Sequence, residues 1–159
     1  MKKKAFLVLL ASALLVTGCG KDDEKKDEKK SDKNTNVSVL KCSAEEDGQK
    51  VTMTIEQNKK TYEITKVEME MSMPKSLYAD YGFSDEQLEK LVCEDDEDVE
   101  SCNAKVTSDT VSATIKYKTD AYVEEIKEDE DIEKLDENTL KKLKESGEAD
   151  GYSCTISQK

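Results

Sequence analysis

Residues 50–73 of this chain read KVTMTIEQNKKTYEITKVEMEMSM, and this stretch decides the fold. Its first part alternates apolar and polar side chains, with Val51, Met53 and Ile55 on one face. An alternation of period two is typical of a half-buried β-strand. The polar NKK that follows predicts a turn, and a second, longer strand is expected over residues 61–73. The stretch therefore predicts a β-hairpin.

The longer strand changes phase along its length. Its apolar set begins with Tyr62 and Ile64 and then shifts to Val67 and the three methionines that alternate after it. A two-residue period changes phase only when one residue is inserted, so a β-bulge is expected near Thr65-Lys66. The methionine row could bind copper, but it continues the alternation set by Val67, which favours a core face.

The flanking segments supply the rest of a sheet. Residues 45–48 predict a turn, because Asp47-Gly48 is a strong hairpin signal. Pro74 ends the long strand, since proline cannot donate to a β-ladder. Further strands are expected over residues 37–42, 102–107, 110–118 and 151–157.

Two helices are expected between these strands. Ser84 and Gln87 form a capping box ahead of a helix that runs to about Cys93. A second helix is expected over residues 136–146, with Gly147 as its C-terminal stop. Residues 120–135 fit either a helix or an extension of the preceding strand. The prediction is an α+β fold of order β-β-β-α-β-β-α-β, an antiparallel sheet of about six strands with two helices on one face.

The N-terminus indicates export and lipid anchoring. Three lysines precede a short apolar run that ends in Val16-Thr17-Gly18-Cys19, which resembles a bacterial lipobox. The run is too short to span a membrane. We expect residues 1–18 to be a signal peptide and Cys19 to carry the lipid, although an ordinary signal peptide with an incidental Cys19 remains the alternative. Since Gly20 is not aspartate, an outer-membrane address is expected in a two-membrane cell, and the outer face of the membrane in a one-membrane cell.

The mature chain divides into a tether and one domain. Residues 20–36 contain no apolar side chain, so residues 19–36 are expected to be the lipidated cysteine and a disordered charged tether. Residues 37–159 suit a single domain and are too few for a two-lobed solute-binding protein. This part carries 16 lysines against 31 aspartates and glutamates. Nucleic acid is therefore not an expected partner, whereas the membrane, an envelope protein or a small ligand is.

The composition argues against an enzyme. The chain has no histidine, arginine or tryptophan. Histidine-based nucleophile pairs and metal sites are therefore absent, and no Ser-Lys motif stands out. No cofactor is expected.

The four cysteines of the domain predict two disulfides in an extracytoplasmic setting. Three pairings are possible, and we favour Cys93–Cys102 and Cys42–Cys154. The first pair flanks a short acidic loop, and the second would join the first and last strands. A thiolate metal cluster or a redox pair is disfavoured, because the sequence has no CxxC.

The remaining features give competing functional hypotheses. We expect a non-enzymatic binding or structural module of the cell envelope. The alternative is a divalent-cation site in the acidic runs 94–98 or 128–131, which lack the spacing of an EF-hand loop. Tyr78, Tyr81 and Phe83 could line a ligand surface, but we expect them to cover the apolar face of the sheet.

The layout resembles a family of small bacterial lipoproteins of unknown function, the YehR-like group. The resemblance rests on the lipobox at Cys19, the charged tether, Cys42 in the first strand, the hairpin of residues 50–73 and the segment YADYGFSDEQL at residues 78–88. It implies an α+β domain on the outer face of a membrane. It implies no catalytic residue and no ligand.

Overall fold

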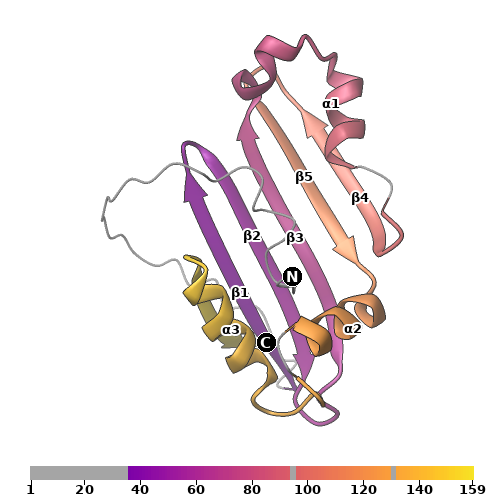
Figure 1. Cartoon of the computed structure of the whole chain (residues 1–159), viewed down its shortest axis with the longest axis vertical. Helices are drawn as coiled ribbons and strands as arrows, with labels where there is room; N and C mark the ends of the chain where they lie inside the picture. The colour runs from indigo at the N-terminus through magenta and orange to yellow at the C-terminus, as the bar shows by residue number, and fades with distance from the viewer. Residues whose placement is uncertain (1–35, 94–95, 130–131) are drawn as a thin grey trace.

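The computed structural model describes residues 36–93, 96–129 and 132–159. These residues form one antiparallel sheet of six strands in the order β4-β5-β3-β2-β1-β6, with helices packed on it (Figure 1). The strands are β1 (Val37–Glu46), β2 (Gln49–Asn58), β3 (Ile64–Pro74), β4 (Val99–Val106), β5 (Thr110–Tyr117) and β6 (Ser153–Gln158). The helices are the 3-10 helix η1 (Lys75–Tyr81), α1 (Asp85–Val92), α2 (Thr119–Asp129) and α3 (Thr139–Ala149). The prediction of a six-stranded α+β fold is confirmed, but η1 and α2 add to the two expected helices.

The β1–β2 hairpin is built on the Asp-Gly turn. Asp47 and Gly48 have φ angles of 50° and 77°, the left-handed values that a tight two-residue hairpin turn requires. A Cβ atom at Gly48 would lie 3.1 Å from Cγ of Pro74, so this position favours glycine for space as well as for φ. The turn pairs β1 and β2 along their full length, and β1 consequently extends to Glu46 instead of ending at Cys42 as expected.

The β2–β3 pair contains the expected bulge. Glu56 pairs with Lys66 and Gln57 pairs with Ile64, so Thr65 is the additional residue on β3. The bulge lets apolar side chains on both sides of it point to the same face. The expectation that Tyr62 belongs to this strand is wrong. Tyr62 lies before β3 in a left-handed conformation with φ of 60°, because the chain must close the turn after β2.

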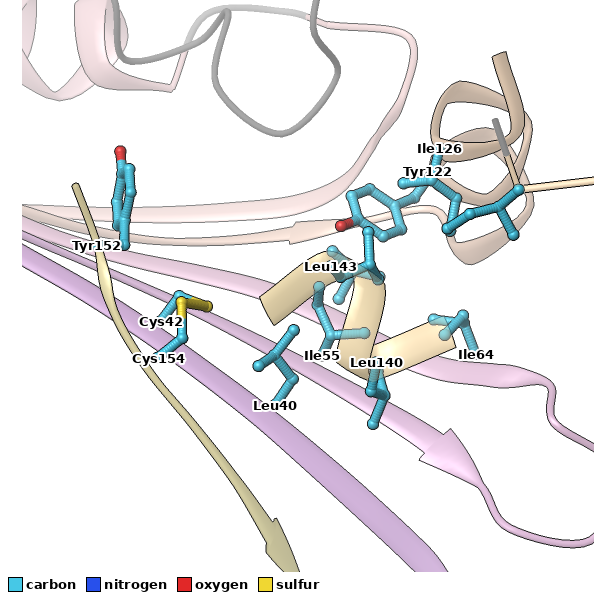
Figure 2. Packing of buried hydrophobic residues seen from close by; sticks show 12 residues of the cluster. Leu40, Cys42, Ile55, Ile64, Tyr122, Ile126, Leu140, Leu143, Tyr152 and Cys154 are labelled. Atoms are coloured by element: carbon cyan, nitrogen blue, oxygen red, sulfur yellow. A yellow bond between two sulfur atoms is a disulfide. The ribbon is translucent and has the colours of Figure 1, made fainter. Parts of the chain in front are cut away.

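One face of the sheet carries the core. Leu40, Ile55 and Val67 project from β1, β2 and β3 to this face and are at most 1% exposed. In Figure 2, Leu140 and Leu143 of α3 lie beside Leu40 and Ile55, as expected for side chains of the same buried cluster. Each large apolar side chain that is fully buried contributes about 1.5–3 kcal/mol to folding, so α3 is held mainly by these leucines. The same cluster contains Tyr122 and Ile126 of α2.

Helix α1 covers the other end of the same face. Leu88 is 1% exposed and packs with Met73 of β3 and Val111 of β5. The expected capping box is present, because Ser84 N–H donates to Oε1 of Gln87 at 2.8 Å and Gln87 N–H donates to Oγ of Ser84 at 3.3 Å. This box fixes where α1 begins.

Helix α3 differs from its prediction at the C-terminal end. The expected stop at Gly147 is wrong, since the helix continues to Ala149 and Gly147 is buried inside it. Gly151, with φ of 93°, takes the left-handed position instead. At the other end, buried Gln57 donates through Nε2 to the carbonyl oxygens of Tyr62 and Asp136, at 3.0 and 3.1 Å. This side chain joins β2 and the turn after it to the residues that lead into α3.

Candidate binding surface

The segment from η1 to α1 forms a connection over one end of the sheet (Figure 1). Pro74 closes β3, and the backbone N–H of Lys75 then donates to the carbonyl of Asp109 at 2.8 Å. Gly82 follows η1 with φ of 66°, a left-handed conformation that reverses the chain before α1. Lys75 Nζ also lies 2.6 Å from Oδ1 of Asp85, so an ion pair links the two helices of the segment.

Four apolar side chains of this segment are exposed to solvent, and we call them the η1–α1 patch. Tyr81 is 71% exposed and its ring stacks on Phe83, with ring centroids 5.8 Å apart and planes 15° apart. Leu77, Phe83 and Leu91 are 45%, 38% and 47% exposed. In the part of the chain that the structure describes, only Ile156 is a further large apolar side chain with comparable exposure. Tyr81 and Phe83 thus form an exposed apolar contact, flanked along the chain by two exposed leucines, and exposed apolar surface of this kind is a candidate interaction site.

A hollow of about 440 Å³ lies beside the patch. Tyr78, Phe83 and Leu88 contribute its apolar lining, whereas Lys75 and Asp109 contribute charges of opposite sign. Tyr78 is half-buried, and its hydroxyl contacts Sδ of Met73 at 3.0 Å, which fixes the ring against the sheet. A hollow lined by apolar and polar groups to a similar extent suits an amphipathic side chain or small group of a partner.

The three aromatic residues singled out in the sequence therefore have different roles. The expectation that all of them cover the sheet is wrong for Tyr81 and Phe83. Helix η1 has no buried residue, and Leu88 with half-buried Tyr78 covers this end of the core instead. Nothing in the local pattern separates Tyr78 from Tyr81, because the difference depends on which side of η1 meets β3.

Residues 96–98 of the first acidic run form a turn that is held by hydrogen bonds. Asp98 N–H donates to Oδ1 of Asp96 at 2.8 Å, and Lys118 Nζ donates to the carbonyl of Glu97. Among the described residues, no group of three or more His, Cys, Asp or Glu side chains converges in a way that could hold a metal ion. Residues 94–95 and 130–131 of the two acidic runs lie outside the described residues.

Two disulfides cross-link the domain. Cys42 of β1 and Cys154 of β6 are directly opposite in the ladder, with Cα atoms 4.0 Å apart (Figure 2). Cys93 at the end of α1 is bonded to Cys102 of β4, with Cα atoms 5.6 Å apart. These are the two pairs predicted from the sequence. Disulfides persist in oxidising compartments, so they indicate an extracytoplasmic protein. Cys19 lies outside the described residues.

Two tyrosines have raised pKa values. Burial, and secondarily the carboxylates of Asp96 and Glu125, raises the pKa of Tyr117 from 10.0 to about 12. Burial, followed by the charge of Asp150, raises the pKa of Tyr152. Both phenols therefore stay protonated and uncharged at neutral pH.

Within the residues that the structure describes, none of the helices has the length and apolar character needed to cross a membrane.

No protein-family model matches the chain, and no curated protein matches it. A solved structure, described as the NMR structure of the protein from Streptococcus pneumoniae TIGR4, is similar with 17% sequence identity and a TM-score of 0.43. The similarity covers 88% of this chain and 99% of the other.

Proposed function

We propose that this chain is a lipoprotein anchored through Cys19 to the extracytoplasmic side of a membrane, and that its domain is a non-enzymatic module that binds another envelope protein. The observation that carries the proposal is the η1–α1 patch. Its exposed leucines and stacked aromatic pair leave water only if a partner covers them. Aromatic side chains of this kind supply much of the binding energy in protein interfaces.

The charges around the patch limit the partner. Between residues 75 and 92 the chain carries two lysines and four carboxylates, and Lys75 is already paired with Asp85. A partner segment with apolar side chains and a lysine or arginine would therefore be attracted, whereas an anionic surface would be repelled. We propose that an apolar, basic segment of an envelope protein docks on the patch, with one of its side chains in the adjacent hollow.

Site-specific photo-cross-linking in intact cells tests this proposal. A photoreactive phenylalanine analogue is placed at position 81 of the full-length protein, and at exposed Lys60 as the matched control site on a distant turn. We expect a discrete adduct from position 81 that is lost in a Leu77→Ser, Leu91→Ser background, because these exposed residues can change without damaging the core. Loss of about 2 kcal/mol of apolar contact would weaken binding about thirtyfold, which is enough to remove most of the adduct.

Two outcomes would contradict the binding proposal. One is the absence of any adduct at position 81, and the other is an equal adduct from position 60. The anchor is tested separately by mass spectrometry of the mature N-terminus and by membrane fractionation of a Cys19→Ala variant. An unmodified Cys19, or a variant that stays in the membrane fraction like the native protein, would refute lipid anchoring without affecting the patch.

A further inference from the structure

The two edge strands of the sheet are protected to different degrees. The β4 edge contains a bulge between Val99 and Ser101 and has charged side chains at Glu100 and Lys105, which are two of the devices that prevent edge-to-edge pairing. The β6 edge has none of these. Its sequence SCTISQ has no charge and no proline, and its pairing with β1 is unbroken. No other strand of the described chain lies beyond it.

The direction of the free backbone groups on β6 follows from one hydrogen bond. Lys159 N–H donates to the carbonyl of Val37 on β1 at 3.0 Å. Backbone groups alternate in direction along an antiparallel strand. The backbone N–H and C=O groups of Cys154, Ile156 and Gln158 therefore point away from β1, toward the open edge.

The side chains beside this edge are compatible with self-association. Ile156 is 44% exposed, so α3 leaves it uncovered. Strand β6 carries no charge, and α3 beside it has three lysines and two glutamates. Residues 96–100, at the opposite edge, contain four carboxylates and no lysine. Strand β6 and helix α3 together therefore carry no net negative charge, so two copies that meet at β6 place no net negative charge of these elements against each other.

We propose that β6 is a self-recognition edge, which pairs antiparallel with β6 of a second copy about a two-fold axis at Ile156. Opposed residues of an antiparallel pair share a face of the sheet, so this axis keeps the helices of both copies on the same side. In this register Ile156 lies opposite Ile156 of the other copy, and Cys154 lies opposite Gln158 of the other copy. Every outward N–H and C=O group of these three residues gains a partner, and the exposed isoleucines bury each other. This inference does not depend on the η1–α1 patch.

Disulfide trapping between differently tagged full-length chains tests both the edge and the register. The proposed register places Thr155 directly opposite Ser157 of the second copy, with both side chains on the face without helices. A Thr155→Cys chain and a Ser157→Cys chain are co-expressed and exported, and mixed disulfides are measured on non-reducing gels. Chains with Ser101→Cys and Asn103→Cys, exposed residues of the β4 edge, form the matched control. Because covalently linked dimers accumulate over time, this assay also detects a weak, transient dimer.

We expect the mixed Thr155→Cys/Ser157→Cys product to exceed both same-residue products and the β4 control. An added Ile156→Lys substitution should reduce it by about tenfold, because it removes the apolar contact at the axis and places two ammonium groups opposite each other. Ser101→Lys makes the same change of charge on the other edge and should not reduce it. Circular dichroism of each variant checks that it folds. The proposal is wrong if folded chains give no mixed product, if the β4 pair traps equally, or if Ile156→Lys has no effect.

Discussion

Removing each disulfide in turn should reveal how the two bridges divide the stability of the domain. The Cys42–Cys154 bridge closes a sequence separation of 112 residues, and the Cys93–Cys102 bridge closes one of 9. From loop-closure entropy, removing the first bridge should lower the free energy of unfolding by about 5 kcal/mol, and removing the second by about 3 kcal/mol. The first loss is comparable to the whole stability of many domains of this size.

Packing should widen this difference. Cys42 is fully buried and Cys154 is 6% exposed, and both belong to the core cluster around Leu40 and Ile55. Replacing both with alanine leaves a cavity in addition to the lost cross-link, at a further cost of about 1–2 kcal/mol. Cys93 and Cys102 are only half-buried, so replacing them should cost little stability beyond the loss of loop-closure entropy.

Urea unfolding followed by circular dichroism compares the two double-alanine variants with the native protein. We expect the Cys42→Ala, Cys154→Ala variant to be less stable than the Cys93→Ala, Cys102→Ala variant by about 3 kcal/mol, and to be partly unfolded in dilute buffer. The matched number of substitutions makes each variant a control for the other. Equal losses, or a larger loss from the short bridge, would refute the reasoning from loop length and burial.

Two further perturbations test local features of the fold. Gly48→Ala should destabilise the protein by about 1–2 kcal/mol, because φ is positive there and the added Cβ meets the Pro74 ring. Gly82→Ala should destabilise it by only about 1 kcal/mol, the cost of a positive φ for alanine, since no atom lies within 4 Å of the added Cβ. Thermal unfolding of both variants checks the order, and an equal loss would contradict the steric argument. Because the pKa of Tyr117 is raised on folding, its protonated phenol contributes fully to folding stability below pH 10. This contribution is lost as the pH rises from 10 to about 12. Tyr117→Phe should reduce the fall in stability over this interval by roughly 1–2 kcal/mol after allowance for solvent screening, and unchanged alkaline unfolding curves would contradict the assignment.

Local features of the sequence predicted much of the architecture. The Asp47-Gly48 turn, the bulge at Thr65 and the capping box at Ser84 each depend on residues a few positions apart, and all three are present. By contrast, the sequence left residues 120–135 open between helix and strand, and the structure forms helix α2 only over Thr119–Asp129, where Tyr122 and Ile126 pack in the core cluster. The same reason explains why the exposure of Tyr81 was missed, since burial depends on which side of η1 meets β3.

The sequence by itself determined which segments form strands and which residues turn the chain between them, although not the exact strand ends, and it predicts the address of the protein through Cys19. Alternation, turn residues and capping residues act over a few positions, and a signal motif is read as a linear string. Only the tertiary structure decided that β6 closes the sheet beside β1, which leaves an unprotected edge there, and that the η1–α1 patch faces solvent. Both features arise from contacts between residues far apart in the chain, because burial and strand order are settled when the whole core packs together.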